Sequence, residues 1–160
     1  AALLTLLLDA LKGFIPVMLI KLYGEPYGMG AGTMALVGLA AFFGHLYPVF
    51  FKFKGGKGVA TACGILFGIN WILGLATLGT WIIVATFMRY SSLAALAAAV
   101  FGPIYFVFLF GFQPMVIALL VVCLLLIWRH RSNITNLMNG TESRIGSKKK
   151  AQAAEEKGRS

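Results

Sequence analysis

The sequence predicts an all-α, polytopic integral membrane bundle of about six short transmembrane or membrane-embedded helices. Of its 160 residues, 59% are hydrophobic and only 12% are charged, and the mean hydropathy is +0.86. This composition is typical of membrane proteins rather than of soluble domains. The 19 glycines point the same way, because small residues allow membrane helices to pack closely. A spanning helix needs roughly 20 residues, so the chain is long enough for one compact bundle.

Apolar runs separated by polar residues, Gly or Pro predict the individual helices. Their ranges are 2–22, 33–51, 59–72, 74–88, 93–110 and 114–129. We divide the stretch 59–88 into two helices because one helix would be about 45 Å long, against a bilayer core of about 30 Å. The division also places Lys57, Arg89 and the basic tail on one side, as the positive-inside rule requires. We therefore expect the start of the chain and the tail to be cytoplasmic.

The charge distribution predicts a membrane-embedded domain over residues 1–146 and a disordered basic tail over 147–160. The net charge is +9, and it lies between hydrophobic runs and in the tail, which suits cytoplasmic loops and anionic lipid better than nucleic acid. A nucleic-acid binder would need a folded basic domain, for which the tail is too short. Cys63 and Cys123 lie inside apolar runs, so we expect small core residues and no disulfide or metal site.

The segment 52–61, Lys-Phe-Lys-Gly-Gly-Lys-Gly-Val-Ala-Thr, is the most specific signal. Gly55, Gly56 and Gly58 let the backbone approach a ligand closely. A helix is predicted to begin directly afterwards, so free N–H groups and the positive helix dipole favour an anion, to which Lys57 adds a charge. We predict phosphate binding here. The alternative is an ordinary basic loop on the cytoplasmic side.

Two further groups of polar residues are predicted at the same membrane face. Arg89 and Ser92 follow the short helix pair and can complete a phosphate clamp. His130 and Asn133 end the last apolar run and share one face if the helix continues, and Glu142 follows them. The alternative is a basic flank, which explains the arginines but not the His, Asn and Glu.

Three more polar residues lie inside apolar runs, where charges are costly and usually face a bundle interior or cavity. Asp9 and Lys12 are three residues apart and can pair on one helix face. His45 comes near the end of the second run, just before the glycine segment. For all three, a structural role and a supporting role in the site both remain open.

These motifs closely resemble those of the bacterial acyl-phosphate:glycerol-3-phosphate acyltransferases, the PlsY family, over about residues 1–146. The pattern Gly-His-x-x-Pro-Val-Phe stands at 44–50, Phe-Lys-Gly-Gly-Lys-Gly-Val-Ala-Thr at 53–61 and Arg-Tyr-x-Ser at 89–92. The residues that match the last pattern are His130, Arg131, Asn133, Ile134, Leu137, Gly140 and Glu142.

The sequence departs from the family pattern in two places. Asn136 stands where the family has an arginine, which weakens one phosphate contact. The resemblance also implies a further N-terminal helix and a Ser-Gly-Asn-x-Gly-Ala-Thr-Asn loop carrying a catalytic Ser and a phosphate-binding Arg, and neither occurs in this sequence. We therefore expect seven helices in the family and six here, and the activity of this chain alone stays open.

The resemblance implies transfer of a fatty acyl group from acyl phosphate to the sn-1 hydroxyl of glycerol 3-phosphate. The products are lysophosphatidic acid and phosphate, in the first step of phospholipid synthesis. Lys57 and the backbone of 55–58 would bind a phosphate with Arg89 and Ser92. His130 and Asn133 would orient the reacting groups, with Asn133 as an oxyanion donor. Either His130 or the donor's phosphate takes the proton.

The same resemblance predicts the role of Glu142 and the setting of the enzyme. Glu142 binds the glycerol hydroxyls or pairs with an arginine, and the acyl tail lies between helices. We expect a monomer in the bacterial inner membrane with a cytoplasmic active site, no cofactor and no metal. The rival classes are an organic-anion transporter and a catalytically incomplete membrane fragment. A transporter would need polar residues along its spans, and the central spans have few, namely Thr77, Thr80 and Thr86.

Overall fold

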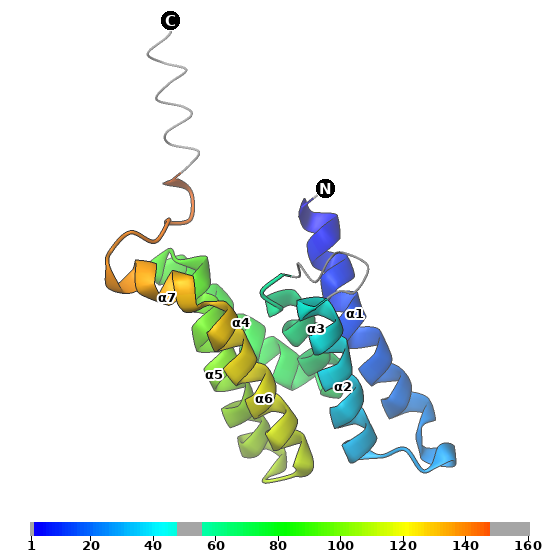
Figure 1. The fold of residues 1–160 in the computed structure, drawn as a ribbon. Coiled ribbons are helices and arrows are strands. Elements are labelled where there is room, and N and C mark those ends of the chain that lie inside the picture. The colour runs from blue at the N-terminus through cyan, green and yellow to red at the C-terminus, as the bar shows by residue number, and fades with distance from the viewer. Residues whose placement is uncertain (1, 48–55, 148–160) are drawn as a thin grey trace, which may run out of the picture.

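The computed structural model describes residues 2–47 and 56–147, and these ranges fold as a bundle of α-helices (Figure 1). The helices are α1 (Ala2–Tyr23), α2 (Ala31–Leu46), α3 (Val59–Ile69), α4 (Trp71–Met88), α5 (Ser91–Phe110), α6 (Pro114–Arg129) and α7 (Arg131–Met138). A 3-10 helix, Glu25–Tyr27, follows α1. The predicted all-α class is confirmed. Residues 48–51 of the second predicted helix lie outside the described ranges, as does the tail beyond residue 147.

The predicted division of residues 59–88 into two helices is confirmed, but the break lies at Asn70, three residues before the predicted boundary at residue 73. The backbone of Asn70 is extended, and its side-chain oxygen accepts hydrogen bonds from the N–H groups of Ile72 at 2.8 Å and Leu73 at 3.3 Å. At the end of α3, Lys21 Nζ donates to the carbonyl of Ile69 at 2.7 Å. Both helix ends at the break therefore receive side-chain partners for backbone groups that the helices themselves leave free.

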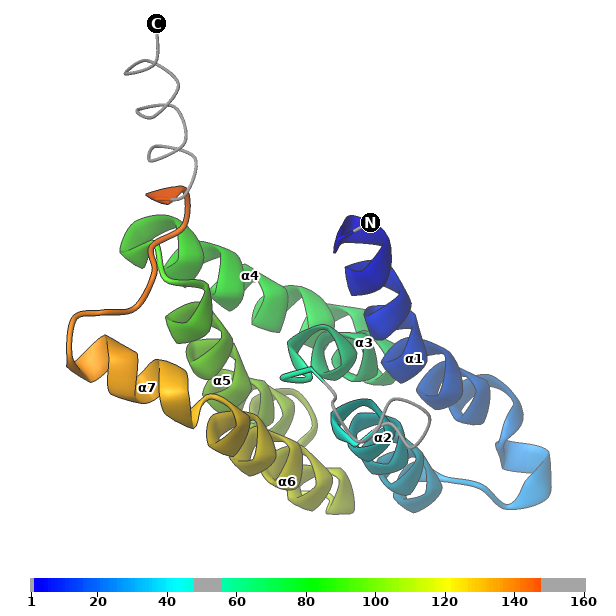
Figure 2. The ribbon, with the colours of Figure 1, turned by 45° about the horizontal axis from the view of Figure 1, so that its top comes forward.

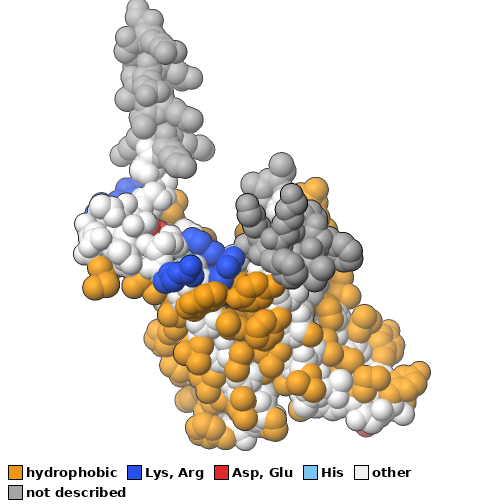
Figure 3. All heavy atoms as spheres, in the orientation of Figure 1, with side chains coloured by type: hydrophobic (Ala, Val, Ile, Leu, Met, Phe, Trp, Pro, Cys, Tyr) orange, Lys and Arg blue, Asp and Glu red, His pale blue; other side chains and the backbone are white. Residues whose placement is uncertain are grey.

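Three helices of the described chain are long and apolar enough to cross a bilayer, over Leu3–Tyr23, Trp71–Met88 and Ser91–Phe110, and α6 with α7 makes a fourth if this bent pair counts as one span. Helix α3 has 11 residues, so it is about 16 Å long and reaches only about halfway through the hydrocarbon core. Large apolar side chains cover the outer faces, and examples are Leu3, Leu19, Leu75, Ile83, Phe108 and Leu124. Figure 3 shows these apolar surfaces below a group of Lys and Arg side chains. Such a surface fits lipid rather than water.

Helices α1 and α3 pack with their backbones in direct contact. A Cβ atom placed on Gly64 would lie 1.9 Å from the carbonyl oxygen of Ala10, and one on Gly13 would lie 2.2 Å from the carbonyl oxygen of Thr61. Only glycine fits at either position. The approach places the first turns of α3 against the middle of α1.

The up-and-down order of the helices brings the polar motifs to one end of the bundle (Figure 2). The end of α2, the start of α3, the corner between α4 and α5, and α7 all lie there. Helix α7 is not among the six predicted helices, because it is polar and a search for apolar runs does not detect it. It follows α6 after a bend of 58°.

Candidate active site

The glycine segment before α3 has a conformation that requires glycine at position 58. Gly58 has a φ of +83°, and a Cβ atom there would lie 2.5 Å from Cε2 of the buried Phe42 ring. Its carbonyl accepts the N–H of Ala62 at 2.8 Å, which starts α3. Gly56 and Lys57 are exposed. Gly55 lies outside the described ranges, so the phosphate-binding role of its backbone stays a prediction.

Four of the predicted site residues form one hydrogen-bonded network at the polar end. Lys57 Nζ donates to Asn133 Oδ1. Asn133 Nδ2 donates to Glu142 Oε1 at 2.7 Å, and Ser92 Oγ donates to the same oxygen at 2.6 Å. The four residues come from the segment before α3, from α7, from the stretch after α7 and from the first turn of α5. Segments far apart in the sequence therefore meet as the topology predicted.

The two partners of Asn133 determine how its amide is oriented. An ammonium group only donates and a carboxylate only accepts, so Oδ1 faces Lys57 and Nδ2 faces Glu142. One Nδ2 hydrogen is used by Glu142, and among residues 2–47 and 56–147 no second acceptor is seen for this amide, so the other hydrogen can be offered to a ligand. The arrangement thus holds an amide donor in a defined direction beside a cation.

The hydrogen bonds to Glu142 control its charge. Desolvation acts to raise the pKa of this carboxyl, but hydrogen bonds from Ser92, Asn133 and Asn136, with the charge of Lys57, outweigh it and hold the pKa below its usual range. Its partners in the described chain are hydroxyl and amide groups rather than the arginine that the sequence left open. Asn136, at the position of the family's arginine, supports Glu142.

We expect the stabilising effect of Glu142 to depend on pH in a defined direction. Because its folded-state pKa is lowered, its contribution is present above the ordinary carboxyl pKa and is lost as the pH falls through the lowered one. The measurement is the difference in thermal unfolding temperature between the wild type and Glu142→Gln, in detergent, from pH 7 down to pH 3. A wild-type advantage that is constant or grows on acidification would contradict the prediction.

Arg89 holds the stretch after α7 in place. It has a left-handed backbone with φ of 60° at the end of α4. Its Nη2 donates to the carbonyl of Ile145 at 2.9 Å, and the Ile145 N–H donates to the Arg89 carbonyl at 2.7 Å. The guanidinium has five N–H donors, so this contact leaves others for the predicted phosphate. That role stays a prediction.

His130 is buried at the bend between α6 and α7, with 2% of its surface exposed. Its Nδ1 lies 2.8 Å from the carbonyl oxygen of Leu126. A carbonyl only accepts, so Nδ1 carries a hydrogen and Nε2 is unprotonated in the neutral ring. Lys57 and Glu142 are the charged groups that interact electrostatically with the His130 ring. The chain bends by 58° at His130, which is the N-cap residue of α7, and its carbonyl accepts the N–H of Ile134 at 2.9 Å.

The polar residues inside the apolar runs of α1 and α2 also meet. The predicted pair of Asp9 and Lys12 is confirmed, with 2.9 Å between Oδ1 and Nζ. His45 Nδ1 lies 3.5 Å from the same carboxylate oxygen. Arg129 Nη2 donates to the carbonyl of Gly56 at 3.0 Å. Sequence reasoning missed the contact between Asp9 and His45 and the role of Arg129, because both depend on which helices are neighbours.

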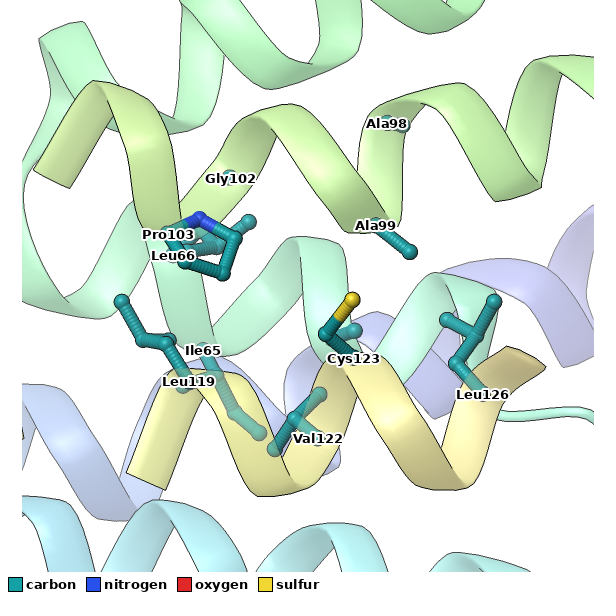
Figure 4. A pocket seen from close by; sticks show the side chains of 11 residues that line it. Ile65, Leu66, Ala98, Ala99, Gly102, Pro103, Leu119, Val122, Cys123 and Leu126 are labelled. Atoms are coloured by element: carbon teal, nitrogen blue, oxygen red, sulfur yellow. The ribbon is translucent and has the colours of Figure 1, made fainter. Parts of the chain in front are cut away.

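An apolar pocket is formed inside the bundle, with Leu126 among its lining residues (Figure 4). It lies between α3, α5 and α6, and its empty volume of about 320 Å³ includes space that is open to solvent. Ile65, Gly102 and the free, buried Cys123 contribute to its lining. Leu126 lines it as well, and the carbonyl of Leu126 is the partner of His130. A single turn of α6 therefore connects an apolar space to the polar end.

Comparison with known proteins gives one consistent result. The sequence profile of the family described as glycerol-3-phosphate acyltransferase matches residues 1–140. A glycerol-3-phosphate acyltransferase of Paraburkholderia phytofirmans is 62% identical over 154 residues, which are 96% of this chain and 72% of the relative. One from Ralstonia nicotianae is 60% identical over 150 residues, 94% of this chain and 72% of the relative.

Two solved structures are similar as well. Both are crystal structures of PlsY, an integral membrane glycerol 3-phosphate acyltransferase. The lysophosphatidic acid form has a TM-score of 0.82 at 38% identity and covers 91% of this chain and 72% of that chain. The glycerol 3-phosphate form has a TM-score of 0.83 at 37% identity, over 92% of this chain and 72% of that chain.

Proposed function

This chain belongs to the glycerol-3-phosphate acyltransferase family, and we propose that its acyl donor is acyl phosphate. The acyl group passes to the sn-1 hydroxyl of glycerol 3-phosphate, and the products are lysophosphatidic acid and inorganic phosphate. The similar PlsY structures in glycerol 3-phosphate and lysophosphatidic acid forms support this acceptor and this product. Family membership also favours an enzyme over the organic-anion transporter.

The observation that carries the proposal is the network from Lys57 through Asn133 and Glu142 to Ser92. Both substrates carry a phosphate, and the two phosphates repel each other. A lysine ammonium and the open N–H groups before a helix are suited to hold such an anion. The exposed segment at Gly56 and Lys57 supplies both groups.

In the proposed reaction, the sn-1 hydroxyl oxygen attacks the acyl carbonyl carbon, and the bond between that carbon and the phosphate oxygen breaks. Phosphate leaves with the bonding electron pair. The free Nδ2 hydrogen of Asn133 stabilises the negative charge on the carbonyl oxygen. The hydroxyl proton passes either to Nε2 of His130 or to the leaving phosphate. Glu142 acts by holding Asn133, and Arg89 with Lys57 binds phosphate.

The acyl chain is proposed to occupy the pocket between α3, α5 and α6. Its lining is apolar, and it reaches Leu126 next to His130. An alkyl chain in this pocket exchanges contacts with lipid tails for contacts with equally apolar side chains. With the phosphate of the donor at the polar end and the acyl chain in this pocket, the acyl carbonyl would lie near the network.

We further propose a monomer in the bacterial inner membrane with this polar end in the cytoplasm. The charged side chains at that end, among them Lys57, Arg89 and Arg129, support the orientation through the positive-inside rule. Both phosphorylated substrates would then reach the site from the cytoplasm.

The decisive test is release of inorganic phosphate from a synthetic acyl phosphate, dependent on glycerol 3-phosphate, by purified protein in lipid nanodiscs. We expect release together with equimolar lysophosphatidic acid. The assay is run on this chain and on the same chain preceded by the N-terminal segment of the Paraburkholderia phytofirmans relative, because the chain matches 72% of that protein. Transfer from acyl-CoA or acyl carrier protein but not from acyl phosphate, with both proteins, would overturn the donor assignment.

Substitution of His130 distinguishes the two proton acceptors. If Nε2 is the base, His130→Gln lowers kcat by about 10²-fold or more and removes the acidic limb of the pH–rate profile. If the leaving phosphate takes the proton, the acidic limb remains. The control for folding is the thermal unfolding temperature of the variant.

A further inference from the structure

Asp9 is a carboxylate on an apolar spanning helix, and its surroundings extend beyond a simple ion pair. Its side chain is 20% exposed, and it lies 2.9 Å from Lys12 Nζ and 3.5 Å from Nδ1 of His45 on α2. The backbone carbonyl of Asp9 accepts a hydrogen bond from the buried Thr61 hydroxyl of α3 at 3.0 Å. Asp9 therefore contacts the two helices that flank the glycine segment.

The opposite edge of the His45 ring faces the glycine segment. A Cβ atom placed on Gly56 would lie 2.7 Å from Nε2 and 3.2 Å from Cε1 of His45. The ring is only 11% exposed. It is thus held between the Asp9 carboxylate on one side and the Gly56 backbone on the other, and no side chain other than hydrogen fits at position 56 without displacing it.

Gly56 has a second contact from another helix. Arg129, at the end of α6, donates from Nη2 to the Gly56 carbonyl at 3.0 Å. Lys57 directly follows Gly56 in the sequence, and its ammonium group donates to Asn133 of α7. The backbone that would receive a phosphate is therefore supported by α2 on one side and by α6 and α7 on the other.

We propose that Asp9 and His45 are a positioning pair that holds Gly56, and with it Lys57, in the geometry that binds a substrate phosphate. The Asp9 carboxylate accepts the Nδ1 hydrogen of His45 and so sets the orientation of the ring, as second partners of a histidine commonly do. The ring then limits where the Gly56 backbone can lie. The inference rests on the proposed function, because it concerns the same phosphate site.

The test measures the KM of glycerol 3-phosphate and of acyl phosphate separately in Asp9→Ala and His45→Ala. We expect one of the two KM values to rise about tenfold with kcat within about threefold, since a cradle shared by ground state and transition state contributes uniform binding. Asp9→Asn keeps an oxygen acceptor for His45 Nδ1 and should restore most of the loss. The double variant should resemble either single variant, because the two residues act as one unit.

A matched control separates this role from general charge removal. Glu25 lies on the 3-10 helix beyond the far end of α1 and makes no part of the site, so Glu25→Ala should change neither KM. Unchanged KM values in Asp9→Ala and His45→Ala would overturn the inference. So would a fall of kcat in parallel with the unfolding temperature, with no rescue by Asp9→Asn.

The contact between His45 and Gly56 has its own test. Gly56→Ala should raise the same KM in the wild type, because the added methyl group meets the His45 ring. In the His45→Ala background the methyl group has space, so Gly56→Ala should add little. An equal rise in KM in both backgrounds would refute the contact between His45 and Gly56 as its cause.

Calorimetric binding of glycerol 3-phosphate and of inorganic phosphate distinguishes failure of this inference from failure of the proposed function. Weaker binding in Asp9→Ala supports the pair even if acyl phosphate proves not to be the donor. If the wild type turns over acyl phosphate and Asp9→Ala binds phosphate as tightly as the wild type, the positioning role of Asp9 and His45 is overturned and the proposed function stands.

Discussion

Lys57→Ala is expected to lower kcat/KM for acyl transfer by about 10²- to 10³-fold, the usual effect of removing one preorganised donor from a charged transition state. The loss has two physical sources. The ammonium no longer attracts phosphate, and Asn133 Oδ1 loses the donor that helps to orient its amide. Lys57 lies in an exposed segment outside the helices, so membrane insertion and unfolding temperature should hardly change. The measurement is steady-state phosphate release in nanodiscs.

The matched control for Lys57 is another cation at the same end of the bundle. Arg131 lies over the Trp128 ring at 5.0 Å, and its Nη1 donates to the Trp128 carbonyl at 3.4 Å. Arg131→Ala should leave kcat/KM within about twofold. Near-normal turnover in Lys57→Ala would refute its phosphate role. Equal losses in both variants would mean that only the general positive surface matters.

Gly64→Ala is expected to disrupt the bundle, because α1 and α3 touch through their backbones there. The added Cβ would lie 1.9 Å from the Ala10 carbonyl oxygen, so one helix must move. Overpacking of this kind costs typically 1–3 kcal/mol and more where backbone is involved. Asp9, next to Ala10, would move with α1. We therefore expect a lower unfolding temperature in detergent, a lower yield of folded protein and a loss of activity.

Gly79→Ala is the matched control for this substitution. Gly79 lies within α4, and a Cβ atom there would meet no atom within 4 Å. Alanine is about 1 kcal/mol more favourable than glycine inside a helix, so this variant should be as stable as the wild type or slightly more stable. If both variants behave alike, the close approach of α1 and α3 does not contribute to stability.

Much of the fold follows from the sequence because lipid imposes a simple rule on it. Spanning segments must be apolar and helical, so hydropathy and punctuation located α1 to α6 to within about three residues, except that the second predicted range ran to residue 51 whereas α2 ends at Leu46. A break within 59–88 was also predictable, since one helix would overshoot the bilayer, but it lies at Asn70 rather than at the predicted boundary at residue 73. Helix α7 was not predicted, because it is polar and a search for apolar runs does not detect it.

The candidate site divides in the same way. The residue types at 56–58, 89–92 and 130–142 indicate phosphate chemistry, and their placement at one membrane face follows from counting helices. Neighbouring helices are a different matter, since hydropathy does not say which spans touch. The pairing of Asp9 with His45 and the contact of Arg129 with Gly56 needed the packed bundle.

The sequence by itself determined that this is a polytopic membrane protein with a basic, glycine-containing segment at one face, and its motifs identified the acyltransferase family. It did so because apolar length and local backbone chemistry are written along the chain. Only the tertiary structure decided that Lys57, Asn133, Glu142 and Ser92 form one network. It also decided that His45 lies between Asp9 and Gly56. Those contacts join segments that are far apart in the sequence, and which segments become neighbours depends on the shapes of all the packed surfaces at once.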